Sequence, residues 1–221
     1  MRVVALVPIK LTNERLPGKN LVPLSSGESM LDRILVTLGA VEAIDDVVVF
    51  CSDRSIQAAT ERHGARFLRR SADLDLPTAT SNMILDSFAA EMPADIFVLA
   101  HATAPLLRTV TLERGLRAVM SGDYDSALSV VGMHDFLWTN DGPLNYDPSN
   151  IPRTQDLEPI YRETSGFYIF KREVLSELGR RVGVRPFLTE VDPIEALDVD
   201  EQRDLDLVNA VLLAQNESAR H

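Results

Sequence analysis

A repeated alternation between short apolar segments and segments of helical period limits the folds open to this chain more than any other feature. Four runs are compact, apolar and rich in β-branched residues, which is typical of strands buried in a parallel sheet. The intervals between them are long enough to hold a helix, as parallel connections require. The runs are RVVALVPI (2–9), DVVVFCS (46–52), ADIFVLA (94–100) and DSALSVV (125–131).

The segments between these strands carry the apolar spacing of amphipathic helices. In the first, apolar residues recur at i, i+3, i+4 and i+7 from Leu31, and Ser29 with Asp32 three residues later forms an N-cap pair of the capping-box kind. The alternation predicts a three-layer α/β/α domain with helices on both faces of a mostly parallel sheet. Single cores extend to roughly 250–300 residues, so we expect residues 1–221 to form one domain. Further helices are predicted at 55–64, 81–92 and 111–122.

The alternation ends after the fourth strand, where residues 132–160 are rich in Pro, Asn, Asp and aromatic residues. A structureless stretch of this length inside a compact domain requires a purpose. We interpret residues 133–160 as an excursion that packs on a partner subunit, with Phe136 and Trp138 as interface anchors, so a homodimer is expected. Order is predicted to resume with a strand at ETSGFYIF (163–170), and 195–215 reads as a strand followed by a helix.

Charge and hydropathy exclude several classes of partner. The net charge of −11 argues against a broad attraction for nucleic acid or anionic lipid. No apolar run approaches the roughly 18 residues of a membrane span, and the opening segment is too short and too soon charged for a secretory signal. The single cysteine, Cys51, fits a reducing compartment. We therefore expect a cytoplasmic protein with neither nucleic-acid nor membrane partners.

An acidic protein must meet any anionic ligand locally, and the loop after the first strand holds two of the three lysines, Lys10 and Lys19. A Walker loop needs Gly and Ser or Thr where this loop has Asn13 and Asn20, and no G-x-G-x-x-G is present. What remains is Lys10, Arg15 and Lys19 at the carboxyl end of a parallel strand, where open α/β sheets bind ligands. This set suits a triphosphate, although a solvated basic loop explains the same residues.

Two acidic residues near the end of the chain form a candidate metal site. Asp198 and Asp200 lie two apart, and residues i and i+2 of a strand face the same way, so both carboxylates could reach one cation. Mg²⁺ often uses only one or two carboxylates together with phosphate oxygens. Asp200 could instead be a helix N-cap, and Asp204 and Asp206 are expected on a solvated helix face. His101, at the end of the third strand, is either a site residue, which we favour, or a packed imidazole.

These segments resemble a known family, the sugar-acid cytidylyltransferases, which comprise the CMP-sialic acid (acylneuraminate) and CMP-Kdo synthetases. VPIKLTNERLPGKNL (7–21) is similar to the family signature P-A-R-x-x-S-x-R-L-P-G-K-N, in which a strand leads into the loop. The resemblance runs nearly end to end and keeps the order of the motifs. The other matching segments are CSD (51–53), LRRSADL (68–74), HATAPLLR (101–108), TQDLEPIYRETSGFYIF (154–170) and LDVD (197–200).

The resemblance implies a fold of the nucleotide-diphospho-sugar transferase (Rossmann-like) type and a nucleotidyltransferase reaction. The anomeric hydroxyl of a 2-keto-3-deoxy sugar acid attacks the α-phosphorus of the co-substrate CTP, giving a CMP-sugar and pyrophosphate. Mg²⁺ would be held by Asp198 and Asp200, and Lys19 and Asp198 would be the catalytic residues. Phosphoryl-type transfer depends on positioning and charge neutralisation, which is consistent with this set.

The resemblance also assigns the binding residues on each side of the reaction. The acceptor carboxylate would pair with Arg153 or Arg162, because an arginine fork suits a planar carboxylate. Contacts to the nucleotide are implied for Lys10, Asn13, Arg15, Lys19, Asn20 and Arg70. Contacts to the sugar acid are implied for His101, Arg153, Tyr161, Arg162 and Tyr168.

Departures from the family pattern concentrate on the acceptor side. His101 replaces Gln, residues 164–165 replace Asn-Gly, and Arg153 is offset by one position, while Lys10 replaces Arg and Glu14 stands where many sialic acid enzymes carry Lys. These departures therefore support cytidylyl transfer more than they support sialic acid itself, and the acceptor we expect is a sialic-acid-like nonulosonic acid. The alternatives are Kdo or another acid or phosphonate acceptor, or a catalytically inactive nucleotide-binding protein of the same fold.

Overall fold

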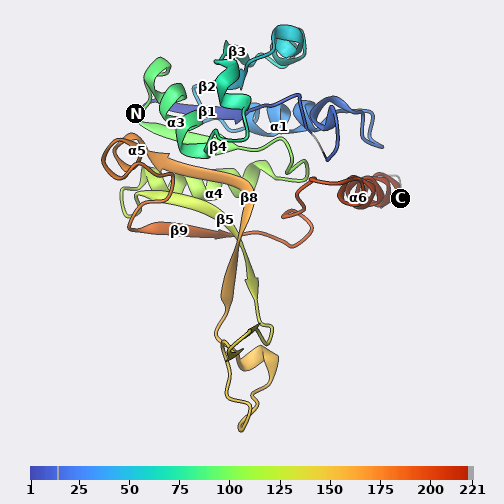
Figure 1. The fold of residues 1–221 in the computed structure, drawn as a ribbon, viewed down its shortest axis with the longest axis vertical. Coiled ribbons are helices and arrows are strands. Elements are labelled where there is room, and N and C mark those ends of the chain that lie inside the picture. Colours follow the sequence, from blue (N-terminus) through green and yellow to red (C-terminus); the bar gives the residue numbers. More distant parts are fainter. Residues whose placement is uncertain (14, 219–221) are drawn as a thin grey trace.

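A seven-stranded sheet forms the centre of the computed structural model, which describes residues 1–13 and 15–218 (Figure 1). The strands are β1 (Val3–Pro8), β2 (Asp46–Cys51), β3 (Arg66–Arg69), β4 (Ile96–Ala100), β5 (Ser126–Met133), β8 (Ile160–Lys171) and β9 (Pro186–Glu190). Their order in the sheet is β3-β2-β1-β4-β8-β5-β9. Only β8 is antiparallel to its neighbours in this sheet, so the predicted mostly parallel sheet is confirmed.

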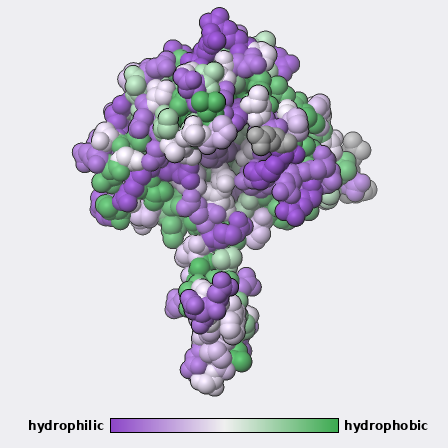
Figure 2. Space-filling view, in the orientation of Figure 1, coloured by the Kyte–Doolittle hydropathy of each residue, from purple (hydrophilic) through white to green (hydrophobic). Residues whose placement is uncertain are grey.

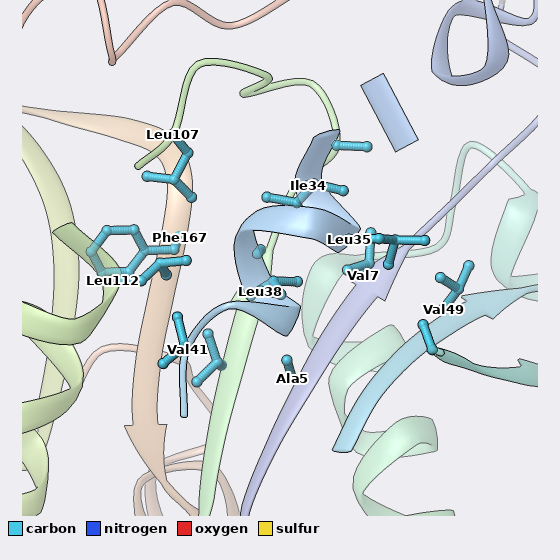
Figure 3. Packing of buried hydrophobic residues seen from close by; sticks show 14 of the residues in the cluster. Ala5, Val7, Ile34, Leu35, Leu38, Val41, Val49, Leu107, Leu112 and Phe167 are labelled. Atoms are coloured by element: carbon cyan, nitrogen blue, oxygen red, sulfur yellow. The ribbon is translucent and has the colours of Figure 1, made fainter. Parts of the chain in front are cut away.

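Helices cover both faces of the sheet, as predicted. Side chains alternate along β1, so Ala5 and Val7 lie in the core beneath α1 and α4 (Figure 3). Val4 and Leu6 lie in the core on the opposite face, beneath α3 and α5. A third apolar cluster joins α6 to the start of α1. The helices are α1 (Met30–Gly39), α2 (Gln57–Glu61), α3 (Ser81–Glu91), α4 (Thr109–Met120), α5 (Arg172–Leu178) and α6 (Gln202–Ser218).

The capping box predicted for α1 is present. The Ser29 hydroxyl accepts a hydrogen bond from the backbone N–H of Asp32, and the Asp32 carboxylate accepts from the backbone N–H of Ser29. Asp32 also lies 2.7 Å from Nε2 of His63, for which the sequence indicated no role. Burial alone would raise the pKa of Asp32, but the bonds from Ser29 and His63 hold it below its ordinary value. One carboxylate thus links the start of α1 to the end of α2.

Residues 133–160 leave the body of the molecule as an arm instead of a structureless loop (Figures 1 and 2). Past a register shift at 128–130, β5 and β8 remain paired down to Met133 opposite Ile160. The tip holds a short hairpin, β6 (Trp138–Thr139) with β7 (Gly142–Pro143), and a 3₁₀ turn at Thr154–Asp156. Trp138, Leu144 and Ile151 are all more than half exposed there.

Some elements differ from the sequence prediction. The strand expected around LDVD is wrong, because residues 193–196 form turns and 197–200 adopt no regular structure. Edge strands β3 and β9 and helix α5 were not predicted. Within 1–13 and 15–218, no helix is both long and apolar enough to cross a membrane.

Candidate active site

Two segments about 180 positions apart in the sequence meet at the carboxyl end of β1. The ammonium group of Lys19 donates to the backbone oxygen of Val199 at 2.6 Å and to Oδ1 of Asp200 at 3.0 Å. Arg15 Nη2 lies 3.2 Å from the other carboxylate oxygen of Asp200. A cavity of about 430 Å³ opens where they meet, lined by Lys10, Thr12, Asn13, Arg15, Leu16, Lys19, Pro77 and Asp200.

The opening loop is held in shape by its own polar groups. The Asn13 and Asn20 amides donate to the backbone oxygen of Lys10, at 2.8 and 3.3 Å. Gly18 has φ 68°, a left-handed conformation that suits glycine, and it leads into a 3₁₀ turn at Lys19–Leu21. Asn20 is buried, and its Oδ1 has no hydrogen-bond partner among the described residues. The loop therefore presents a fixed, unused acceptor beside a cation-lined cavity.

Asp200 is the electrostatic partner of the loop. Partial burial would raise the pKa of its carboxyl, but the adjacent Lys19 and Arg15 outweigh that effect and lower it. Lys19 is itself buried, with a side chain only 9% exposed. The backbone oxygen of Val199 and the Asp200 carboxylate therefore offset the cost of burying its ammonium group. Lys19 thus fastens the 199–200 segment to the loop, which leaves one of its three N–H donors for a ligand.

Asp204 fixes the same segment from the other side. Its Oδ2 accepts from the backbone N–H groups of Asp200 and Glu201, at 3.0 and 2.8 Å. The sequence predicts Asp204 on a solvated helix face, but its carboxylate instead accepts from the N–H groups of the two residues that precede α6. The Asp200 carboxylate is directed to Lys19 and Arg15, so its reading as the cap is not supported.

A buried arginine lies beyond the carboxyl end of β3. The side chain of Arg70 is 2% exposed, and Nη2 donates to Asp75 Oδ1 at 2.6 Å. Asp75 is held in turn by the hydroxyl of Ser52. Nε and Nη1 of Arg70 are buried without a partner among the described residues. Unpaired donors on a buried cation are costly, so these two nitrogens are candidates for contact with a ligand.

A second cluster of side chains surrounds Tyr168. The ring of His101 lies edge-on at 6.3 Å, and its Nδ1–H donates to the backbone oxygen of Ser165 at 2.7 Å. The phenol donates to the carboxylate of Glu163. Burial is the main cause that lowers the pKa of His101 and raises the pKa of Tyr168, so both are neutral at pH 7.

Asp198 connects the two halves of the site. Its Oδ1 is buried and has no hydrogen-bond partner within the described residues. Its charge is close enough to raise the pKa of both His101 and Tyr168. The prediction that Asp198 and Asp200 share a strand face is wrong, because the segment is irregular and the two carboxylates have different neighbours. Their backbone instead joins the loop cavity to the Tyr168 cluster.

The model for the family described as Cytidylyltransferase matches residues 4–219 of the chain. The chain belongs to this family. An N-acylneuraminate cytidylyltransferase from Oncorhynchus mykiss is 28% identical over 211 residues, which cover 91% of this chain and 48% of that protein. The chain therefore spans about half the length of such relatives.

Relatives of similar length are also found. A 3-deoxy-manno-octulosonate cytidylyltransferase from Synechococcus elongatus is 26% identical over 219 residues, covering 91% of this chain and 86% of that protein. A solved CMP:2-keto-3-deoxy-manno-octonic acid synthetase complexed with CTP superposes with a TM-score of 0.72. The match covers 97% of this chain and 100% of that one at 18% identity. The fold of the chain is thereby of the predicted nucleotide-diphospho-sugar transferase type.

Three residues expected to bind the acceptor lie on the arm. Arg153 is 72% exposed at the tip and pairs with Asp156. Tyr161 and Arg162 are exposed on β8, opposite 131–132 of β5. Among the described residues, no hydrogen bond, ion pair or ring contact joins any of the three to His101 or Tyr168. Glu14, where the family pattern also changes, lies outside the described residues.

Three charged residues near the site were missed by sequence reasoning. Arg181 stacks on the ring of Tyr168, with Cζ 3.7 Å from its centroid, and pairs with Glu163 at 3.3 Å. Asp75 orients Arg70. Glu163 lies inside a quoted motif, but Arg181 follows α5 in a segment with no motif. Its position beside Tyr168 results from the tertiary fold and not from a local sequence pattern.

Proposed function

We propose that the chain transfers CMP from CTP to the anomeric hydroxyl of a 2-keto-3-deoxy sugar acid of the sialic-acid-like nonulosonic type and releases pyrophosphate. The observation that carries the proposal is the joining of two sites by one segment, residues 198–200. Asp200 lies with Lys19 and Arg15 in the 430 Å³ cavity, and Asp198 is close enough to His101 and Tyr168 for its charge to raise the pKa of both. A group transfer needs donor and acceptor to meet at such a point.

On the nucleotide side, the cavity suits a triphosphate. Lys10, Arg15 and Lys19 bring three positive charges to it, and fixed cations stabilise a leaving pyrophosphate. The unpaired Oδ1 of Asn20 suits the amino group of cytosine, and the unpaired nitrogens of Arg70 suit its carbonyl or the ribose oxygens. This division of acceptor and donor favours cytosine over uracil, whose C4 oxygen would face the Asn20 acceptor.

The residues present fit Mg²⁺. Asp198 Oδ1 is a buried carboxylate oxygen without a partner, which a divalent cation would satisfy, and Asp200 supplies a second carboxylate two residues on. No cluster of three or more His, Cys, Asp or Glu side chains suited to a metal occurs in the parts of the chain that are described, so phosphate oxygens or water would complete the coordination. A bound Mg²⁺ would neutralise triphosphate charge. Lys19 would keep Asp200 in place for it.

On the acceptor side, neutral His101 and Tyr168 would hydrogen-bond sugar hydroxyls. Kdo is the second candidate acceptor, supported by the Synechococcus elongatus relative, which matches over 86% of its own length. A homodimer formed through the arm is proposed as the working assembly, in which Arg153, Tyr161 or Arg162 would reach the acceptor site of the partner. Exposed Trp138, at the tip, would anchor that contact.

The test is pyrophosphate release from CTP with N-acetylneuraminate, Kdo and a phosphonate as acceptors, with Mg²⁺ and with EDTA. We expect turnover with a sugar acid that EDTA abolishes, and preference for CTP over UTP. Asp198→Asn should lower kcat by at least about 100-fold, because a catalytic metal contributes several kcal/mol. Asp206→Asn is the matched control, since this exposed carboxylate on α6 contacts only Gln202 among the described side chains.

Other outcomes separate the alternatives. Turnover with Kdo alone would support the second candidate acceptor. CTP binding without turnover on any acceptor would support a catalytically inactive nucleotide-binding protein. Failure to bind CTP at all, or full activity in Asp198→Asn, would contradict the assignment of this site.

A further inference from the structure

Arg181, close to the Tyr168 cluster, has more hydrogen-bond donors than its single ion pair uses. Arg181 follows α5, and its guanidinium stacks on the ring of Tyr168 at 3.7 Å from the centroid. Its only hydrogen bond among the described residues runs from Nη2 to Glu163, at 3.3 Å. The side chain is 27% exposed, so the remaining N–H groups are accessible to solvent. The stacking fixes the plane of the guanidinium while most of its donors stay unused.

The position of Arg181 relates it to the reacting centre. Its charge lowers the pKa of both Tyr168 and His101, and the charge of Asp198 acts on the same two residues in the opposite direction. The charges of Arg181 and Asp198 therefore act on the same two rings, those of Tyr168 and His101. A ligand that contacts both rings would be near the guanidinium of Arg181, which stacks on one of them.

We propose that Arg181 binds the carboxylate of the acid acceptor. The proposal rests on the proposed function and adds to it the residue that recognises the acid. In a 2-keto acid the carboxylate is bonded to the anomeric carbon, so the group that holds it must be near the reacting hydroxyl. Arg181 meets this condition within its own subunit. Arg153 and Arg162, the sequence-based candidates, lie on the arm, where Arg153 pairs with Asp156 and Arg162 lies opposite Val131 of β5.

Glu163 does not prevent this role. Its side chain is 51% exposed, and its contact with Arg181 uses one nitrogen at 3.3 Å, so the pair is a weak one in water. A guanidinium offers two edges, and an acceptor carboxylate can take the edge that Glu163 leaves free or exchange with it. The stacking on Tyr168 would then hold the guanidinium of Arg181 in one orientation toward the acid.

The test compares Arg181→Gln, Arg181→Lys and Arg180→Gln, with N-acetylneuraminate and Kdo as probes. Arg180 is the matched control, because it is adjacent and exposed and its side chain contacts only the backbone oxygen of Gly183 among the described residues. Losing a charged hydrogen-bonded contact should raise the KM for the acid roughly 10- to 100-fold in Arg181→Gln. The Kd for CTP, the melting temperature and the kinetics of Arg180→Gln should stay near wild type, and Arg181→Lys should recover part of the loss.

The carboxamide of the same acid gives a second readout that a structural role would not produce. Wild type should discriminate strongly against the carboxamide, and Arg181→Gln should discriminate much less, because the carboxylate has lost its partner. Turnover by wild type with an unchanged KM in Arg181→Gln would overturn this inference alone. CTP binding without binding or turnover of either acid by wild type would overturn the proposed function, and this inference with it.

Discussion

At the scale of single residues, burial sets the charge of the acceptor side. His101 donates Nδ1–H to the backbone of Ser165, and the burial of its ring lowers the pKa below 6.5, the ordinary value. The neutral ring leaves Nε2 as an acceptor for a hydroxyl. Asp198, which raises the pKa, does not reverse the effect.

The lowered pKa of His101 predicts a pH dependence of stability. Below 6.5 the unfolded chain binds a proton at this histidine and the folded chain does not, so acidification favours unfolding until the folded pKa is reached. The free energy of unfolding in urea should therefore fall more between pH 7.5 and 5.5 in wild type than in His101→Gln. The excess is at most about 1.4 kcal/mol per pH unit. Equal falls in the two proteins would show that His101 titrates normally, which an NMR titration of the ring would confirm.

The sequence indicated some residues of the candidate site and missed others, for a physical reason. Lys10, Lys19 and Asp200 could be found because their charges follow or precede recognisable strands and helices. Asp75 and Arg181 contact Arg70 and Tyr168, respectively. Neither contact follows a spacing that could be recognised in the sequence, because the tertiary fold brings the partners together. The roles assigned to Asn20, Arg70 and Asp198 stay predictions, although each has a buried polar atom without a described partner.

At the scale of elements, burial decided which strands could be predicted. Four strands are apolar runs because both faces are covered. Edge strands β3 and β9 carry charged or exposed residues, as in RFLR (66–69), and β9 begins with Pro186, so their apolar pattern is weak. β8 is antiparallel because the arm returns the chain directly beside β5. A local sequence pattern does not reveal this direction. LDVD is apolar enough for a strand, but Lys19 and the backbone oxygen of Thr103 hold it outside the sheet.

The capping box of α1 predicts a measurable contribution to stability. Ser29→Ala removes the hydroxyl that accepts from the N–H of Asp32, and such caps contribute about 1 kcal/mol. The free energy of unfolding in urea should fall by about that amount. The control is Ser176→Ala, which removes an exposed hydroxyl on α5 that lies 3.5 Å from the backbone oxygen of Glu173. It should change the free energy of unfolding by less than about 0.5 kcal/mol. Equal effects in the two variants would contradict the role of the cap.

At the scale of the whole molecule, the arm is the feature that a lone subunit does not explain. Figure 2 shows it standing clear of the body with apolar residues among hydrophilic ones. Trp138, Leu144 and Ile151 are each 60–64% exposed along it. Exposed aromatic and aliphatic side chains on one projecting element are typical of an interface.

The arm predicts that association depends on its apolar residues. Trp138→Ser combined with Ile151→Ser should raise the dimer dissociation constant at least about tenfold, because buried aromatic anchors dominate interface energy. Sedimentation equilibrium measures the constant directly. Met83→Ser is the control, since Met83 is 48% exposed on α3 of the body. A monomeric wild type, or an unchanged constant in the double variant, would argue against the arm as an interface.

The alternation of side chains along β8 limits how the acceptor side of the site can evolve. Phe167 faces the core under α1 and α4, and its neighbour Tyr168 faces the opposite core. Because side chains alternate along a strand, inserting or deleting one residue between Tyr168 and Lys171, where β8 pairs regularly with β4, would exchange those two faces. Changes of length in β8 are therefore expected at the register shift that precedes Phe167, and only substitutions within the regularly paired part.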